Sequence, residues 1–80
     1  MQAQEIITKV TDIFKYVLDD DTIVLCETTT ATDIEEWDSL SHIQLIGAIE
    51  KQFKIKFTAP EIRGFKNVGD ICNTIHRKLS

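Results

Sequence analysis

The sequence has few basic residues and no cluster of them. Nine lysines and arginines stand against thirteen acidic residues, which gives a formal net charge of -4, and only Arg77 and Lys78 are adjacent. Without a basic patch, the chain lacks the long-range attraction that nucleic acids and anionic membranes exert on basic proteins. The acidic residues gather at Asp19-Asp20-Asp21 and again between residues 33 and 38. We therefore expect no nucleic acid partner, and a protein partner recognised by charge would present a basic surface.

Cysteine is also scarce, and the spacing of the two cysteines excludes their usual structural roles. Cys26 and Cys72 are far apart in the chain, with no CxxC motif and no histidine nearby at ligand spacing, so neither a disulfide framework nor a zinc site is predicted. We expect two buried or half-buried thiols in a reducing compartment. An EF-hand loop that began at Asp19 would need glycine and glutamate where Val24 and Thr30 stand. No metal site is predicted.

Long apolar runs are absent as well. No stretch approaches the length needed to cross a bilayer, and the first residues have neither the basic nor the apolar region of a secretion signal. The sequence predicts a cytoplasmic protein without stable membrane insertion, and we expect a monomer. With 80 residues, the chain forms one domain, residues 1–80, with one core. That core uses most of the 42 % apolar residues, which leaves too few for a deep active site, so we expect no enzymatic activity from this chain alone.

The first half of the chain predicts one helix and a long loop. Apolar residues recur every three or four positions between Glu5 and Leu18, which indicates an amphipathic helix, and the aspartates at 19–21 oppose the helix dipole and end it. Residues 22–37 are rich in β-branched side chains, but residues 54–57 are the only other extended candidate, and a lone two-stranded pair is marginal in water. We therefore predict a crossing loop with four buried side chains. They are Ile23, Leu25, Ile34 and Trp37.

Helix-start signals divide the second half of the chain into three further helices. Asp38 or Ser39 can cap a helix that runs to about residue 53 or 54. The segment Thr58-Ala-Pro-Glu61 matches a capping box and predicts a short helix that ends near Gly64. Asn67 caps the last helix, whose apolar face consists of Val68, Ile71, Cys72, Ile75 and Leu79. The predicted fold class is all-α, a small four-helix bundle of three main helices and one short third helix, with a long loop between helices one and two.

The helix that follows Asp38 is apolar on two sides. The first side, which suits a core, consists of Leu45, Ile46, Ile49 and Phe53. The second side consists of Leu40, Ile43 and Gly47, with Gln44, Glu50 and Lys51 as its polar members. A second apolar strip beside a helix N-terminus indicates contact with another molecule.

The segment from residue 36 to residue 43 holds the side chains with chemical potential. A hydrolase interpretation makes Ser39 the nucleophile, His42 the base and Asp38 its orienting partner. Consecutive residues at a helix start point in different directions, and the glycines of a nucleophile elbow are missing. We reject catalysis by Ser39. From Asp38 and Ser39 alone, plain helix capping is the favoured interpretation.

The wider pattern, Asp38-Ser39-Leu40 after a long acidic loop and before a helix rich in Ile and Leu, resembles the acyl carrier proteins. The resemblance extends from the first helix to the Asn67-Val-Gly-Asp70 segment, and the residues from Trp37 to Ile43 are similar to those of stand-alone, specialised carriers. It implies that a phosphopantetheinyl transferase attaches the 4′-phosphopantetheine arm of coenzyme A to Ser39, within a motif completed by Asp38 and Leu40. A phosphodiester there would gain about 0.3–1 kcal/mol from the helix N-terminus.

This resemblance implies a carrier and not an enzyme. The chain would present acyl groups as thioesters in fatty-acid, polyketide or related specialised biosynthesis, to acyl-activating, acyltransferase or synthase enzymes that supply the catalytic groups. An aminoacyl or peptidyl carrier is the alternative within the same chemistry, although such carriers favour glycines where Glu36, Trp37 and Asp38 stand. A helical adaptor that only binds other proteins, with Ser39 as a mere helix cap, is the alternative from a different class.

Partner enzymes are expected to contact a face beside Ser39. Its candidate docking residues are Trp37, Leu40, Ile43, Gln44, Gly47 and Glu50. Trp37 has an alternative role in packing the loop onto the bundle, and His42 either contacts the phosphate or faces solvent without a role. Carriers commonly continue this face with glutamates, whereas Gln44 and Lys51 occupy those positions here. We therefore expect poor recognition by general fatty-acid enzymes.

Overall fold

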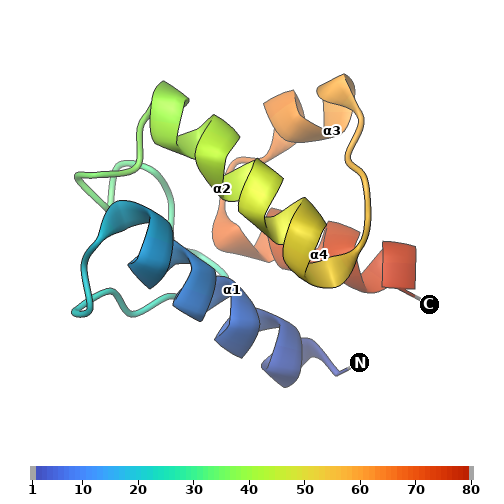
Figure 1. Cartoon of the computed structure of the whole chain (residues 1–80), viewed down its shortest axis with the longest axis horizontal. Helices are drawn as coiled ribbons and strands as arrows, with labels where there is room; N and C mark the ends of the chain where they lie inside the picture. Colours follow the sequence, from blue (N-terminus) through green and yellow to red (C-terminus); the bar gives the residue numbers. More distant parts are fainter. Residues whose placement is uncertain (1, 80) are drawn as a thin grey trace.

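The computed structural model describes residues 2–79, and four helices make up its regular structure (Figure 1). They are α1 (Ala3–Leu18), α2 (Ser39–Phe53), α3 (Ala59–Gly64) and α4 (Val68–Leu79). Within residues 2–79 there is no β-strand, which confirms the predicted all-α fold with a short third helix. None of the described helices is long and apolar enough to span a membrane. The first helix begins at Ala3 instead of Glu5, because the small and polar residues before Ile6 continue the helix without adding to the apolar pattern.

The core lies where α1, α2 and α4 meet. α1 packs against both α2 and α4, and α3 lies on the side of α2 that faces away from α1 (Figure 1). The buried apolar residues of these three helices are Ile6, Val10, Phe14, Leu45, Ile46, Ile49, Phe53, Val68, Ile71, Cys72 and Ile75. All four residues predicted for the inner side of α2 are among them. Leu79, predicted on the buried face of α4, is instead 36 % exposed, because it lies in the last turn of the helix.

Residues 19–38 form the long loop between α1 and α2. Its predicted buried side chains, Ile23, Leu25, Ile34 and Trp37, are all 9 % exposed or less. Short turns shape the exposed parts: Asp20 accepts a hydrogen bond from the amide of Thr22, and Asp33 accepts one from the amide of Thr30, both at 2.9 Å. The segment rich in β-branched residues thus forms a loop and not a strand. The loop is held in place by the burial of apolar side chains and by local hydrogen bonds.

The helix ends follow the signals in the sequence. α1 ends at Leu18, as the run of aspartates predicted, and its C-cap Asp19 has a left-handed backbone with φ of 53°. Thr58 and Glu61 form the predicted capping box of α3. The carboxylate of Glu61 also contacts Arg77 and Lys78 at 3.1 and 3.0 Å, which ties α3 to α4. The Thr58 amide and, secondly, Lys78 lower the pKa of Glu61 to about 2.

The N-terminus of α4 is capped by the long loop as well as by its own cap residue. Asn67 accepts a hydrogen bond from the amide of Asp70 at 2.8 Å, as predicted. In addition, the carbonyls of Thr29 and Glu27 accept from the amides of Val68 and Gly69 at 2.9 and 2.8 Å. A Cβ atom at position 69 would lie 2.9 Å from the Glu27 carbonyl oxygen, so this approach requires glycine. The loop is therefore fixed to the helix that it crosses.

Candidate functional site

The start of α2 is held by a reciprocal pair of hydrogen bonds. Asp38 is the N-cap, and its carboxylate accepts from the amide of Ser41 at 2.9 Å. The hydroxyl of Ser41 in turn accepts from the amide of Asp38 at 2.7 Å and donates to the carbonyl of Glu36 at 2.9 Å. The Ser41 amide is the main reason why the pKa of Asp38 lies below its usual value. The capping role of Ser41 was not predicted, because the serine stands where a capping box normally has glutamate or glutamine.

Ser39 is the first residue of α2 and its side chain is exposed. Ser41, which is only 8 % exposed, has its hydroxyl occupied by the cap. Among residues 2–79, the Ser39 hydroxyl makes no hydrogen bond to another protein group, so it is free to react. The two serines of this segment therefore differ: one holds the helix start and the other faces solvent. That difference is what a site of covalent modification requires.

His42 connects three parts of the fold. The indole N–H of Trp37 donates to Nδ1 of His42 at 3.1 Å. Because an indole nitrogen can only donate, Nδ1 must be the acceptor and Nε2 must hold the proton of the neutral ring. Nε2 then donates to the carbonyl of Ile62 at 3.3 Å. Both expectations for His42 are wrong, since it neither points freely to solvent nor keeps a ring nitrogen for a phosphate, and instead joins α2 to the loop and to α3.

Trp37 is buried, with 6 % of its surface exposed. Its ring meets that of Phe14 edge to face at 5.0 Å between centroids and stacks with the ring of His42 at 6.0 Å. The indole is therefore not an exposed docking residue, and its inclusion among the docking candidates is corrected. The alternative, packing of the loop onto the bundle, is what the structure shows, because burial of an indole removes a large apolar area from water.

The outer side of α2 presents the remaining docking candidates. Leu40 and Ile43 are 69 % and 68 % exposed, and a Cβ added to Gly47 would have no neighbour within 4 Å. Gln44 is exposed too. Glu50 differs from these residues, because its carboxylate accepts a hydrogen bond from the amide of Phe57 at 2.8 Å and so orders the turn after α2. We define the docking face as Leu40, Ile43, Gln44 and Gly47.

A cavity of about 420 Å³ opens beside Ser39, between the start of α2 and α3. Its apolar wall includes Ile62 and Phe65, and two basic residues, Arg63 and Lys66, also line it. Both basic side chains are exposed. No sequence pattern joined them to Ser39, because they belong to a different helix and the linker that follows it. Contact between α2 and α3 brings the basic pair to the serine.

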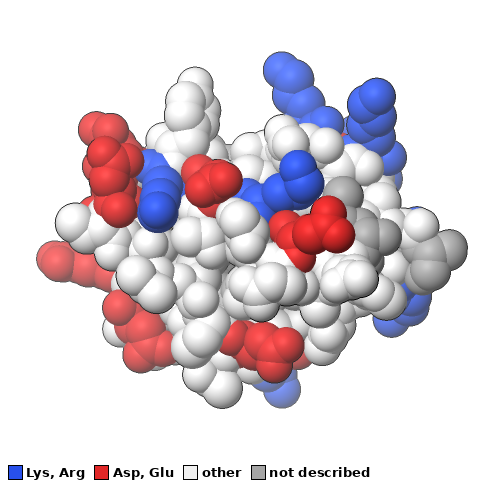
Figure 2. Space-filling view, turned by 90° about the horizontal axis from the view of Figure 1, so that it is seen from below, with Lys and Arg blue, Asp and Glu red and all other residues white. Residues whose placement is uncertain are grey.

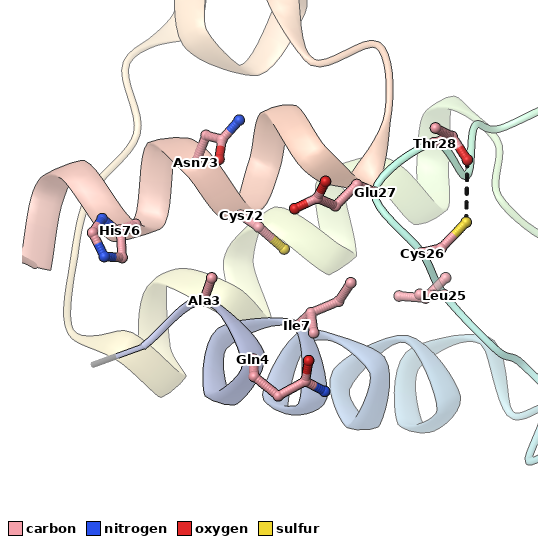
Figure 3. A pocket seen from close by; sticks show the side chains of 10 residues that line it. All are labelled: Ala3, Gln4, Ile7, Leu25, Cys26, Glu27, Thr28, Cys72, Asn73 and His76. Carbon is pink, nitrogen blue, oxygen red and sulfur yellow. Dashed lines mark hydrogen bonds between the residues drawn. The ribbon is translucent and has the colours of Figure 1, made fainter.

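A second cavity, of about 690 Å³, lies between α1, the loop and α4 and contains both cysteines (Figure 3). Cys72 is buried as predicted, and burial, followed by the charge of Glu27, raises its pKa to about 11. Cys26 is exposed, contrary to prediction, because its side chain turns toward the Thr28 hydroxyl at 3.2 Å. Hydrogen bonds from Thr28 and then Thr29 lower the pKa of Cys26. Among residues 2–79, no three His, Cys, Asp or Glu side chains are grouped to hold a metal ion.

The fold and the site together define a class of protein. A small helical bundle in which an exposed serine opens the second helix is the architecture of a carrier domain with a covalent arm. Comparison with protein families agrees: the family described as the phosphopantetheine attachment site matches residues 4–75. Comparison with the curated proteins found no match.

Among solved structures, the solution NMR structure of the holo acyl carrier protein from Geobacter metallireducens is similar to this chain. The two share 48 % sequence identity over 91 % of this chain and 84 % of that chain, with a TM-score of 0.86. The chain belongs to the acyl carrier protein family. It is a carrier and not a catalyst, and its cofactor is covalently attached 4′-phosphopantetheine.

Proposed function

We propose that Ser39 is the attachment point of the arm and that the chain, residues 1–80, is a single carrier domain. Met1 and Ser80 lie outside the described residues. The observation that supports this assignment best is the contrast between the two serines of the motif. Ser39 is exposed and opens α2, whereas the hydroxyl of Ser41 is buried and hydrogen-bonded at both its donor and acceptor sides. Of the two, only Ser39 offers an oxygen that another molecule can reach.

The chemistry of loading follows from this placement. A phosphopantetheinyl transferase joins the Ser39 oxygen to the phosphorus of the pantetheine phosphate of coenzyme A. The bond between that phosphorus and the bridging oxygen of the diphosphate breaks. The nucleotide leaves with that oxygen and the other phosphate, and the serine proton passes to the solvent through the transferase. The positive end of α2 favours the resulting anion, by about 0.3–1 kcal/mol. The arm, once attached, supplies a thiol for thioester formation.

Asp38 positions the serine and does not act as a base. Its carboxylate is held by the amide of Ser41, and its lowered pKa makes it a poor acceptor for the serine proton. The transferase therefore has to provide the base. This division of labour suits a short chain whose apolar residues are committed to the core.

Partner enzymes are proposed to bind the docking face. Leu40 and Ile43 stand one turn apart beside Ser39, and their exposure has no role in the packing of this domain. We propose acyl-activating, acyltransferase or synthase enzymes as the partners, acyl groups of a fatty-acid, polyketide or related specialised pathway as the cargo, and a monomer in the cytoplasm as the working form. The free thiols of Cys26 and Cys72 are in keeping with a reducing compartment.

Intact mass measurement tests the assignment. The wild-type protein, Ser39→Ala and Ser41→Ala are each incubated with coenzyme A and a broad-specificity transferase. We expect the mass of one arm on wild type and on Ser41→Ala, and no added mass on Ser39→Ala. Asp38 still caps α2 in the Ser39 variant, so its circular dichroism spectrum should match that of wild type. An arm on Ser39→Ala would contradict the assignment, and an unmodified wild-type protein would favour the adaptor interpretation.

A further inference from the structure

The cavity beside Ser39 has a charge opposite to that of the chain. The protein has a formal net charge of -4, and in Figure 2 acidic side chains crowd the end of the molecule where the loop between α1 and α2 lies in Figure 1. The charged residues that line the cavity are instead Arg63, Lys66 and Asp38. Two cations and one carboxylate leave one positive charge unmatched. In an acidic protein, this local excess of positive charge makes the cavity a candidate site for an anion.

The acidic side chains of α3 and α4 have partners other than the two cationic groups: the carboxylate of Asp70 accepts a hydrogen bond from the backbone amide of Lys66 at 3.0 Å. Glu61, the acidic residue of α3, pairs with Arg77 and Lys78. Asp38 is occupied by the amide of Ser41. Within residues 2–79, neither Arg63 nor Lys66 forms a salt bridge with an acidic side chain. The two cations are therefore free to bind an anion placed at Ser39.

We propose that Arg63 and Lys66 bind the phosphodiester of the arm in the cavity beside Ser39. This inference rests on the proposed attachment at Ser39. A phosphodiester has one negative charge, which balances the unmatched positive charge of the lining. The planar guanidinium of Arg63 can donate two parallel hydrogen bonds to phosphate oxygens, and the ammonium of Lys66 adds a compact charge.

The apolar wall of the cavity supports the same occupant. The pantetheine arm has a carbon with two methyl groups directly beyond its phosphoester, so the anion is followed at once by an apolar group. Ile62 and Phe65 lie next to Arg63 and Lys66 in the sequence and line the same cavity. His42 and the Ile62 carbonyl keep this wall in place against α2. Cations beside an apolar surface match an anion with methyl groups beside it.

The consequence is a preferred position for the base of the arm. The arm leaves Ser39 toward α3, and the docking face on the outer side of α2 stays open to a partner enzyme. Because the binding is electrostatic and the two cations are exposed, it weakens as salt screens the charges.

The test compares loaded and unloaded forms of three proteins. They are the wild type, the double variant Arg63→Gln/Lys66→Gln, and the matched control Lys51→Gln/Lys56→Gln, which removes two exposed lysines from the last turn of α2 and the linker after it. Peptide mass mapping first establishes that the arm is on Ser39. Melting temperatures of the apo and holo forms, and the phosphorus-31 NMR shift of the holo forms, are then measured at low and high salt.

We expect the arm to raise the melting temperature of the wild type and of the control at low salt, and high salt to remove most of that rise. In Arg63→Gln/Lys66→Gln the rise should be lost at both salt concentrations, and the phosphorus signal should move to its position in the free arm. Equal rises in all three proteins, or a phosphorus shift in wild-type holo protein that does not respond to salt, would overturn the inference while Ser39 remained the attachment point. An arm found on a different residue would overturn the proposed function itself. If the double variant resists loading, the salt response of wild-type holo protein decides.

Discussion

The N-termini of α2 and α4 begin with the same kind of signal and are used in opposite ways. At both ends a side chain of the Asp or Asn type accepts a hydrogen bond from the amide three residues later. At α4 the cap is completed by the carbonyls of Thr29 and Glu27, and Val68 and Gly69 are buried beneath the loop. At α2 the cap is made within a few residues, and Ser39 and Leu40 remain exposed. A capping motif predicts where a helix begins, and tertiary contact decides whether that end is structural or functional.

Truncation of an isoleucine to alanine near each helix start should give the largest difference in stability between the two regions. Ile71 in the first turn of α4 is 1 % exposed, whereas Ile43 near the start of α2 is 68 % exposed. We expect Ile71→Ala to lower the free energy of unfolding by about 2–5 kcal/mol, and Ile43→Ala to change it by about 0.5 kcal/mol or less while slowing acyl transfer by partner enzymes. Urea unfolding of the two apo proteins measures the difference. A large loss for Ile43→Ala would mean that the docking face is part of the core.

Gly69→Ala should break the contact between the loop and α4. The added Cβ would lie 2.9 Å from the carbonyl oxygen of Glu27 and 3.2 Å from Oδ1 of Asn67, and backbone cannot give way as a flexible side chain can. We expect a loss of about 1–3 kcal/mol in the free energy of unfolding, as for other overpacked sites. Thermal and urea unfolding provide the value. An unchanged stability would show that the loop can move away from α4 at little cost.

Gly47→Ala is the matched substitution on the open side of α2. No atom would lie within 4 Å of the added Cβ, so only the difference in helix propensity remains. We expect the apo protein to gain about 0.8–1.0 kcal/mol. The same unfolding measurements apply, and a loss of stability would indicate that Gly47 packs against the rest of the bundle in solution. A transfer rate that falls despite the gain would show that a partner needs the space above Gly47.

The two caps should also differ in their response to acid. Because the folded-state pKa of Asp38 lies below the usual value, its stabilisation is fully present above about pH 4 and is lost as the pH falls through the folded-state value. Asp38→Asn keeps a capping oxygen but cannot titrate, so its stability relative to wild type should rise as the pH decreases from 5 to about 2. Asn67→Ser, the control at α4, should follow wild type in parallel. Melting curves across this range, with parallel lines for all three proteins, would exclude a charged cap at α2.

Features that depend on interactions between residues close in the sequence could be predicted, whereas features that depend on contacts between distant residues could not. The bounds of α2 and α3 and the buried face of α2 depend on spacing within a few residues, and the sequence predicted them. The Asp38-Ser39-Leu40 motif likewise marked the candidate site. The need for glycine at position 69 depends on a carbonyl from the first half of the chain, and no local pattern encodes it.

The errors at the site have the same physical origin. The role of His42 depends on the indole of Trp37 and on a carbonyl of α3, so the pattern of the α2 face alone could not reveal it. Cys26 was expected to be buried or half-buried because cysteine usually is, but nearby threonine hydroxyls provide polar partners at the surface. Arg63 and Lys66 came to Ser39 only through the packing of α3 beside α2.

The hydrogen bonds from Val68 and Gly69 to the loop also make these amides reporters of motion. Their protons exchange with solvent deuterium only when the carbonyls of Thr29 and Glu27 move away, so the first turn of α4 and the middle of the loop open together as one cooperative unit. The start of α2 has no such backbone contact with the loop, and its long-range restraint is instead the side chain of His42, which is hydrogen-bonded to the carbonyl of Ile62. Deuterium exchange at Val68 and Gly69 therefore reports on the contact between the loop and α4, separately from the helix start that contains Ser39.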